Sequence, residues 1–372
     1  MTKICHMTSV HKSNDIRIFE KECSSLAKKP EYKVWLVAQG DSRNENNVEV
    51  IGIGEKPSSR IKRILLFSRQ VYKESKKLDA DVYHFHDPEL LPFGLMLKKQ
   101  GKKVIFDSHE NYSYQIKTRE YMKPALRKII SASYYRLETM AAKHFDAVIF
   151  PCKMNGKHPF EGRSKRPVFI NNAPIFTEND TDRAAQQDSE FTACYVGGLS
   201  EPRGITKSIL AASKAGVKLV LAGRFDSDSY EQKLRAMPEF ECVDYKGQCS
   251  HEEVYNILAS CSVGLSVLQN VGQYKIIETL PTKVYEYMQM KMPVIMGISS
   301  YAKELNDEYK FAELVDPGNE DEIAEAINRL RKDPEKCQEM GNNGYELVKN
   351  HLNWAVEEEK LYKLYQEILT EE

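Results

Sequence analysis

The feature that most constrains this chain is an alternation of strand-like and helix-like runs along nearly its whole length. In the first half, strands are expected at 3–8, 33–38, 48–53, 81–87, 103–108, 147–152 and 168–172. Amphipathic helices are expected between them, at about 15–29, 59–77, up to 97, and 124–143. Such alternation with short connections favours right-handed crossovers and a parallel sheet that is covered on both faces.

A polar stretch divides this pattern into two halves. Residues 177–190, TENDTDRAAQQDSE, contain no apolar run and form the best domain boundary. The alternation then restarts, with strands expected at 191–197, 217–223, 245–247, 263–268, 293–297 and 312–316. Helices are expected after Pro202 and Pro281, and three more finish the chain. The last has apolar residues at helical spacing, namely Trp354, Leu361, Tyr365 and Ile368.

The length of 372 residues also favours two domains, because one ordinary core seldom serves so long a chain. We therefore predict an α/β protein with two Rossmann-like, doubly wound parallel-sheet domains facing a cleft. The N-terminal domain is expected over residues 1–175, the C-terminal domain over 190–350, and a terminal helix over 351–372. Ligands of such sheets bind at the carboxyl ends of the strands, which places the expected site in the cleft.

Composition excludes several classes of protein. Hydrophobic residues make up 41% and charged residues 29%, values typical of a globular chain. No run of about 18 apolar residues predicts a membrane span, and the start MTKICHMTSVHKSN lacks the apolar core of a signal peptide. The eight cysteines include no CxxC pair, so neither a disulfide framework nor a zinc site is expected. The chain is expected in the cytoplasm.

The loop after the first strand excludes two nucleotide-binding classes. A dinucleotide-binding domain would carry GxGxxG there, but TSVHKSNDIR has no glycine. No GxxxxGK[ST] occurs either, so the chain is not a P-loop NTPase.

The loop after the first strand of the second half reads YVGGLSEPRG and suits a phosphate. Gly197 and Gly198 allow a ligand to approach the backbone closely. Pro202 is expected to open a helix, whose N-terminal N–H groups attract anions. Arg203 would add a charged, bidentate donor. A tight turn with a surface arginine is the alternative interpretation.

A second anion site is indicated by ETLPTKVYEYM, residues 278–288. A helix is expected to begin at Pro281, so Lys283 lies in its first turn, where a cation opposes the helix macrodipole by roughly 0.3–1 kcal/mol. A bound diphosphate would reverse that penalty, although an i,i+3 pair with Glu286 is the alternative. The carboxylates of Glu278 and Glu286 could bind two sets of hydroxyls with phosphates between them, which is the layout of a sugar nucleotide.

These motifs resemble those of the retaining glycosyltransferases of family 4, the "group 1" set with the glycosyltransferase-B fold. The resemblance rests on the E-x7-E element Glu278 to Glu286 in its PTKVYEYM form, typical of bacterial surface-polysaccharide enzymes, and on VGGLSEPRG. Weaker similarities are HKSNDIRIFEKE, HFHDPELLP and FDSHENY, and the helix around Trp354 is similar to the terminal segment that crosses back to the first domain.

The resemblance implies a role for each site residue. The N-terminal domain would bind the acceptor and the C-terminal domain the nucleotide sugar. Glu286 would accept hydrogen bonds from the ribose, Glu278 would hold the donor sugar, and Arg203 and Lys283 would neutralise the diphosphate. His109, in DSHENY, matches the family histidine near the reacting sugar; a locally bonded strand-end histidine is the alternative.

One departure from the family concerns the phosphate loop. The common form is G-R-L-x-x-x-K-G, whereas here Gly198 takes the arginine position and Arg203 the lysine position. Lys283 is the expected replacement for the missing cation. No metal or other cofactor is expected, because cations and helix N–H groups can stabilise the leaving diphosphate. No DxD is flanked by the strand pattern that metal-using transferases show, and DSDS at 226–229, in a loop, is expected to cap a helix.

Charge is unevenly distributed along the chain. Residues 1–170 carry 32 Lys and Arg against 19 Asp and Glu, and the remainder carries 21 against 35. Segments 56–77 and 116–138 mix these basic residues with apolar ones, a pattern that suits an anionic membrane surface. A solvated basic face over a normal core is the alternative. Peripheral binding to the inner face of the cell membrane is thus a further expectation; nucleic acid is not expected as a partner.

The predicted function is transfer of a hexose-type sugar, with retention, from a nucleotide-diphosphate sugar to a saccharide or lipid-linked saccharide acceptor in surface polysaccharide synthesis. A UDP-sugar is favoured by family frequency alone. The alternatives are a sugar-nucleotide epimerase on the same fold and a non-catalytic nucleotide-sugar-binding partner of a biosynthetic complex. A phosphorylase of this fold would need a pyridoxal-binding lysine and a longer chain.

Overall fold

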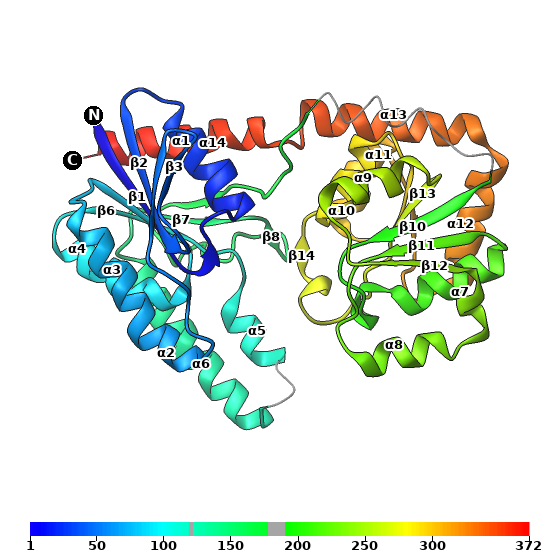
Figure 1. The fold of residues 1–372 in the computed structure, drawn as a ribbon, viewed down its shortest axis with the longest axis horizontal. Helices are drawn as coiled ribbons and strands as arrows, with labels where there is room; N and C mark the ends of the chain where they lie inside the picture. The colour runs from blue at the N-terminus through cyan, green and yellow to red at the C-terminus, as the bar shows by residue number, and fades with distance from the viewer. Residues whose placement is uncertain (119–121, 178–189, 372) are drawn as a thin grey trace. The chain divides into compact units, whose positions relative to one another are not determined.

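The computed structural model describes residues 1–118, 122–177 and 190–371. The chain forms two compact units (Figure 1). Unit 1 comprises Met1–Asn172 together with Trp354–Glu372, and unit 2 comprises Ala173–Asn353. Of the polar stretch 177–190, only the first and last residues belong to the described part of the chain.

Unit 1 is built on an eight-stranded sheet with the order β3-β4-β2-β1-β5-β6-β7-β9. Every neighbouring pair is parallel except β3 and β4, which are antiparallel. The strands are β1 (Thr2–Lys12), β2 (Tyr32–Gln39), β3 (Arg43–Glu45), β4 (Val48–Gly52), β5 (Val82–Phe85), β6 (Lys103–Asp107), β7 (Ala147–Phe150) and β9 (Pro167–Phe169). The expected parallel sheet is confirmed, and the short edge strand β3 was not predicted.

The helices of unit 1 occupy the connections between these strands, as the alternation predicts. They are η1 (Ile16–Cys23), α1 (Ser24–Ala27), α2 (Arg60–Lys62), η2 (Arg63–Phe67), α3 (Ser68–Lys77), η3 (Pro88–Leu90), α4 (Leu91–Lys99), α5 (Tyr112–Thr118) and α6 (Pro124–Ala142). Asp15 caps η1, since its side chain accepts hydrogen bonds from the backbone N–H groups of Arg17 and Ile18. This cap fixes the start of the first helix directly after β1.

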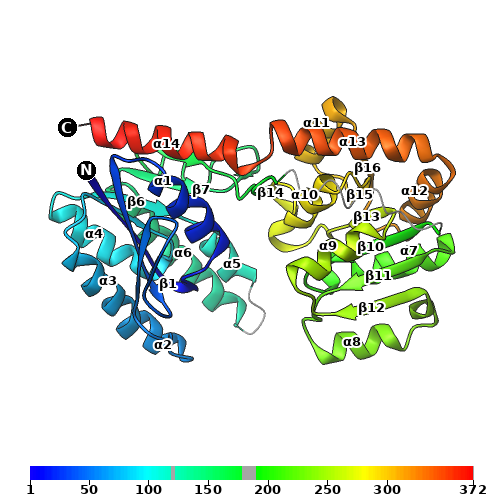
Figure 2. The ribbon, with the colours of Figure 1, turned by 45° about the horizontal axis from the view of Figure 1, so that its top comes forward.

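The last helix of the chain, α14 (Trp354–Thr370), packs on unit 1. Its indole Trp354 Nε1 donates to Ser25 Oγ at 2.8 Å, and the Tyr362 hydroxyl donates to the Ser25 carbonyl at 2.9 Å. Trp354, Leu361, Tyr365 and Ile368 are buried in the same core as the central strands β1 and β2. Both ribbon views show α14 lying along this unit (Figures 1 and 2).

Unit 2 contains a six-stranded parallel sheet with the order β12-β11-β10-β13-β15-β16, which Figure 2 shows in sequence. The strands are β10 (Thr192–Val196), β11 (Lys218–Ala222), β12 (Val243–Gly247), β13 (Val263–Ser266), β15 (Val294–Gly297) and β16 (Ala312–Val315). All six were predicted. The order turns back at β10 and β13, so the carboxyl end of β10 lies at a topological switch point, where ligands of such sheets bind.

The helices of unit 2 are η6 (Glu201–Arg203), α7 (Ile205–Ala215), α8 (Asp228–Arg235), η7 (Pro238–Cys242), α9 (His251–Ala259), η8 (Gly272–Lys275), α10 (Thr282–Gln289), α11 (Ser300–Tyr309), α12 (Glu320–Lys332) and α13 (Pro334–Asn350). The 226–229 stretch caps α8 as expected, because Ser227 Oγ accepts from the Tyr230 N–H. In the described part of the chain, no helix is long and apolar enough to cross a membrane.

Candidate functional site

The loop after β10 is held in a conformation that requires glycine. Gly197 has φ +114°, which side chains rarely adopt. A Cβ atom on Gly223, at the end of β11, would lie 1.9 Å from the carbonyl oxygen of Gly197. The end of β11 therefore approaches the Gly197 backbone too closely for a side chain at position 223. The backbone of this loop is exposed for a ligand, and both Gly197 and Gly198 are exposed.

The expectation that Pro202 opens the main helix is wrong in detail. Glu201–Arg203 form a single 3₁₀ turn, and Gly204 then adopts φ +79° before α7 begins at Ile205. A Cβ atom on Gly204 would lie 2.0 Å from the carbonyl oxygen of Val267, so this turn packs tightly against the end of β13. The physical reason for the later start is that a left-handed residue cannot continue a helix.

Arg203 nevertheless lies beside the glycine loop. Its guanidinium is half-buried, and a Cβ atom on Gly198 would lie 3.6 Å from both Cζ and Nη1 of Arg203. Although burial works against the charge, Tyr195 and Tyr274 raise the pKa of Arg203 above its ordinary value. The guanidinium is thus held over the Gly197–Gly198 backbone as a permanent cation.

Lys283 reaches the same loop from α10, where Pro281 occupies the N-cap and Thr282 begins the helix. The side chain of Lys283 is buried, with a relative exposure of 5%. A Cβ atom on Gly197 would lie 3.5 Å from Lys283 Nζ. Burial, together with the nearby charge of Arg203, lowers the pKa of Lys283 to about 7. Lys283 is therefore buried beside another cation, and the charge of Glu286 only partly offsets these two effects on its pKa.

Tyr195 connects these groups and was missed by the sequence analysis. Lys283 Nζ donates to the Tyr195 hydroxyl at 2.7 Å, and this hydroxyl donates to the Gly198 carbonyl at 3.1 Å. Lys283 Nζ also lies 3.9 Å from the centroid of the Tyr195 ring. Only the position of Tyr195, one residue before the end of β10, could have suggested it. The phenol holds the ammonium and the loop in fixed positions, which is preorganisation for an anion.

The two carboxylates of the E-x7-E element lie in unit 2 and are both half-buried. Glu286 is on α10, one turn after Lys283, and its charge raises the pKa of that lysine against the larger effects of burial and Arg203. Glu278 is in the two-residue strand β14 (Ile277–Glu278) rather than in a loop. Gly197, Gly198, Arg203 and Lys283 thus come together at one loop, with Glu286 beside them; the roles of both carboxylates remain proposals.

His109 belongs to unit 1, where it follows β6 and lies in a network of charged groups. Its Nε2 is 3.0 Å from Asp107 Oδ2, and Asp107 also receives two hydrogen bonds from Arg17, at 2.9 and 3.0 Å. Burial raises the pKa of Asp107, but Arg17 and His109 overcome this and hold it well below the ordinary value. An ionised Asp107 fixes the orientation of the His109 ring.

A pocket of about 310 Å³ lies against His109. It is lined by His11, Asp15, Ile16, Arg17, His109, Pro151 and Asn172. His11 Nδ1 lies 2.9 Å from Asp15 Oδ2. Burial alone would lower the pKa of His11, but the bond to Asp15 and nearby carboxylates raise it above the ordinary value. The pocket therefore offers both hydrogen-bond donors and acceptors, which suit a ligand with hydroxyl groups.

Several residues of this network were present only as weak sequence similarities. HKSNDIRIFEKE contains His11, Asp15 and Arg17, and FDSHENY contains Asp107. All lie at or after the carboxyl ends of β1 and β6, where a parallel sheet gathers polar residues. That position is a signal, but it does not reveal which side chains pair.

Unit 1 also holds two groups whose ligand atoms have the spacing of a metal site, namely His6, Glu22, His84 and His86, and His86, Asp107 and His109. Neither the cysteine spacing nor the DxD motifs of the sequence predict this histidine cluster. The described part of unit 2 contains no such group.

The sequence matches two family descriptions. Residues 22–158 match "Glycosyltransferase Family 4", and residues 176–347 match "Glycosyl transferases group 1". A search of curated proteins returned no match.

Solved structures similar to this one cover nearly the whole chain. Sucrose-phosphate synthase from Thermosynechococcus elongatus has a TM-score of 0.75 at 17% identity, covering 99% of each chain. HepE of Anabaena in complex with UDP has a TM-score of 0.68 at 14% identity, covering 99% of this chain and 100% of that one. A trehalose-6-phosphate protein from E. coli, bound with UDP-2-fluoro glucose, has a TM-score of 0.68 at 13% identity, covering 98% and 99%.

At these identities the structural likeness establishes the fold, while the family matches cover both units of the chain. The parallel-sheet units, the glycine loop after β10 and the basic start of α10 agree with them. The chain therefore belongs to the group 1 glycosyltransferases and has the glycosyltransferase-B fold.

Proposed function

We propose that this glycosyltransferase moves a hexose-type sugar, with retention of anomeric configuration, from a nucleotide-diphosphate sugar to a saccharide or lipid-linked saccharide. A UDP-sugar is the favoured donor. This choice is supported by the similar protein HepE, whose structures contain UDP or UDP-glucose. Cell-surface polysaccharide synthesis is the proposed context, because the PTKVYEYM sequence resembles enzymes of that kind.

The observation that carries the proposal is the placement of Lys283 and Arg203 over the Gly197–Gly198 backbone. Lys283 is buried, its pKa is lowered, and its hydrogen-bond partner is the neutral phenol of Tyr195. Burying an ammonium in this way costs free energy unless an anion joins it. A diphosphate bound against the glycine backbone supplies that anion.

The same groups would assist the reaction itself. As the glycosidic bond breaks, negative charge grows on the departing diphosphate and positive charge on the sugar ring. Fixed cations and a preorganised polar loop stabilise the first of these charges without reorganisation. We therefore propose that the diphosphate needs no metal ion, and that Arg203 and Lys283 act in its place.

The remaining site residues have proposed roles of binding and positioning. Glu286, one turn along α10 from Lys283, would accept hydrogen bonds from the ribose hydroxyls. Glu278 would hold hydroxyls of the donor sugar. His109, oriented by Asp107 and adjoining the 310 Å³ pocket, would contact the reacting sugar or its acceptor.

The acceptor side of the proposal includes an anionic membrane surface. The helical run of 59–77 exposes Ile61, Leu65 and Leu66, with relative exposures of 69%, 63% and 63%. Helix α6 likewise exposes Leu126, Ile129, Tyr135, Leu137 and Met140. Exposed apolar side chains interleaved with lysine and arginine are what an interfacial helix requires, so these observations favour a peripheral enzyme acting on lipid-linked acceptors. Residues 119–121 of segment 116–138 lie outside the described part of the chain.

A donor screen tests the proposal. A nucleotide sugar present at about 100 times its dissociation constant should stabilise the fold by about 2.7 kcal/mol. The stabilising donor should then release nucleoside diphosphate slowly, and the configuration of the freed or transferred sugar, followed by NMR, tests retention. An epimerase would convert the donor without releasing diphosphate, and a non-catalytic binding protein would do neither.

A further inference from the structure

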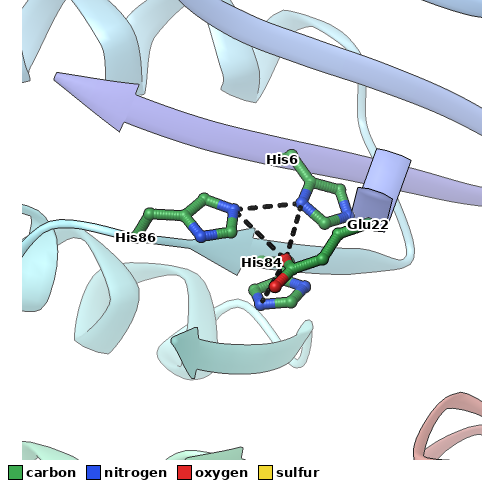
Figure 3. A group of neighbouring side chains, drawn as sticks. All are labelled: His6, Glu22, His84 and His86. Atoms are coloured by element: carbon green, nitrogen blue, oxygen red, sulfur yellow. Dashed lines mark hydrogen bonds and ion pairs between the residues drawn. The ribbon is translucent and has the colours of Figure 1, made fainter. Parts of the chain in front are cut away.

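Four side chains in unit 1 converge on one point in the interior of the protein (Figure 3). His6 lies on β1, His84 on β5 and His86 directly after it, while Glu22 comes from η1. All four are fully buried, with relative exposures of 0%. Three imidazoles and a carboxylate buried together in the interior need an explanation, since such groups are costly to bury without partners.

The distances between the facing atoms suit a four-coordinate metal ion. His6 Nδ1 lies 3.1 Å from His86 Nε2, and Glu22 Oε2 lies 4.0, 3.7 and 3.9 Å from His6 Nδ1, His84 Nε2 and His86 Nε2. All the facing atoms lie within 4.8 Å of one another. In a tetrahedral zinc site with bonds of about 2.0–2.1 Å, ligand atoms are separated by about 3.3 Å. Small side-chain movements would therefore close the site around an ion.

The far side of each imidazole is already bonded. His84 Nδ1 lies 2.9 Å and His6 Nε2 lies 3.3 Å from the hydroxyl of Tyr365. His86 Nδ1 lies 3.3 Å from Asp107 Oδ2. Metal-binding histidines nearly always have such partners, and with the proton on each outer nitrogen the inner nitrogen is free to bind the ion. The three rings are thus oriented as ligands.

Several of the inner atoms lack a hydrogen-bond partner. Both carboxylate oxygens of Glu22 and the Nε2 of His84 are buried without one. Arg17 Nε forms an ion pair with Glu22 Oε1 at 3.2 Å, while Oε2 is the oxygen that faces the three histidines. A cation between Glu22 Oε2 and the three inner nitrogens would satisfy these atoms together.

We propose that His6, Glu22, His84 and His86 bind one divalent transition-metal ion of the zinc class, in a closed site that stabilises unit 1. Imidazole nitrogens with one carboxylate oxygen are ligands that zinc accepts, and four protein ligands without an open position are typical of structural sites. The site shares no ligand with the proposed diphosphate site, whose Gly197, Arg203 and Lys283 lie in unit 2.

The elements that supply the ligands explain what such an ion would do. It would join the neighbouring strands β1 and β5 to the helix η1. Through Tyr365 it would also fix α14, the segment of unit 1 that returns from the far end of the sequence. Metal binding to a site that exists only in the folded state adds directly to the stability of that state.

The second group, formed by His86, Asp107 and His109, is a weaker candidate. Asp107 already receives two hydrogen bonds from Arg17, so its oxygens are engaged. His86 presents Nδ1 to this group and Nε2 to the first, and the first has the unsatisfied atoms. Asp107 therefore serves as the outer partner of a ligand.

Metal analysis of the purified full-length chain is the first test. Protein expressed with added Zn²⁺ should hold one ion per chain by elemental analysis. His84→Asn keeps an N–H group toward Tyr365 but removes Nε2, and should lower the metal content at least tenfold. The matched control His144→Asn changes an exposed histidine of the same unit and should leave it unchanged.

A second measurement keeps the proposal falsifiable if His84→Asn fails to fold. Wild-type protein refolded with Co²⁺ should show the intense visible absorption of four-coordinate cobalt, and refolding with a chelator should lower its melting temperature. Tyr365→Phe removes only the outer hydrogen bonds and should weaken the retention of metal against a chelator by about 10–100-fold. Folded wild-type protein that holds no ion, and shows only six-coordinate cobalt absorption, would overturn the proposal.

The competing interpretation is a buried proton in place of a metal. Burial raises the pKa of Glu22, with Asp107 adding to the effect and Arg17 opposing it, which favours a protonated carboxyl when no metal is bound. Glu22→Gln separates the two cases, because glutamine imitates the protonated acid but binds metal poorly. A loss of metal and of thermal stability supports the metal site, whereas unchanged stability in a metal-free protein rejects it.

Discussion

The ammonium of Lys283 donates a 2.7 Å hydrogen bond to the phenol of Tyr195, although the two residues are 88 positions apart in the sequence. Tyr195 is at the end of the first strand of unit 2, and Lys283 is in the first turn of α10. Their contact places a buried cation beside Gly197 and Gly198.

Binding of UDP should take up a proton above neutral pH. Burial and Arg203 lower the pKa of Lys283 to about 7, so at pH 8 the free protein holds this lysine mostly neutral. A diphosphate favours the ammonium, so binding draws about one proton from the buffer, and the dissociation constant rises by up to about tenfold per pH unit in this range. Titration calorimetry at pH 8 in buffers of different ionisation enthalpy measures the uptake.

The same lysine gives a stability prediction with a defined sign. Its folded pKa of about 7 lies below the ordinary lysine value of 10.5, so between these pH values the unfolded chain binds more protons than the folded chain. Stability rises with pH wherever this holds, so Lys283 should make the unfolding free energy increase from pH 7 upward. Denaturant titrations at several pH values should show this slope in the wild type and not in Lys283→Met; equal slopes would contradict the assignment.

Two glycines at opposite ends of α7 should respond differently to alanine. At Gly204, Cβ would lie 2.0 Å from the Val267 carbonyl oxygen at φ +79°, whereas at Gly216, with φ +62°, nothing lies within 4 Å. Gly216→Ala should cost only the left-handed strain, about 1–2 kcal/mol. Gly204→Ala adds a backbone clash and should cost at least about 3 kcal/mol. Urea unfolding of both variants checks the difference, and equal losses would disagree with this packing.

Glu278→Gln should slow the reaction more than it weakens the binding of UDP. If Glu278 holds the donor sugar, the substitution leaves nucleotide binding near the wild-type value while release of nucleoside diphosphate falls by about 10–100-fold. Glu286 is proposed to bind the ribose, so Glu286→Gln should instead weaken the binding of UDP. Calorimetry with UDP and a coupled assay of diphosphate release separate these two effects. A Glu278→Gln variant with unchanged turnover would remove the residue from the proposed mechanism.

Association with anionic vesicles should depend on the exposed basic face of unit 1. Reversing the charge of Arg60, Lys62, Lys73 and Lys76 removes about 1 kcal/mol of attraction for each residue near the surface. Co-sedimentation with phosphatidylserine vesicles should therefore fall strongly. The control reverses four exposed cations of unit 2, Lys303, Arg331, Lys332 and Lys349, and should bind as the wild type does. Equal binding by both variants would refute the membrane proposal.

Much of the fold could be predicted because the sequence pattern and the structure have the same cause. Buried parallel strands appear as apolar runs, so all six strands of the unit 2 sheet were predicted, as was the helix that carries Trp354 and Tyr365. The start of α7 was misplaced because Pro202 is a common first residue of helices, and nothing local shows that Gly204 packs against Val267.

The site was harder to predict where it depends on tertiary contacts. Gly197, Arg203 and Lys283 belong to local motifs, but Tyr195 becomes part of the site only when its strand lies beside α10. The histidine cluster is a clearer case, because His6 and His84 face each other through strand pairing and Glu22 reaches them from a separate helix. Spacing along the chain contains no sign of such a group.

The most direct test of the central claim compares UDP with uridine on the wild type and on Lys283→Met by titration calorimetry, with Lys303→Met as the exposed control. If Lys283 binds the diphosphate, the substitution should reduce the affinity for UDP by about 10–100-fold, the value of one to two lost charge-assisted contacts, and leave uridine binding unchanged. Lys303→Met should match the wild type for both ligands. Equal affinity of the wild type and Lys283→Met for UDP would contradict the account.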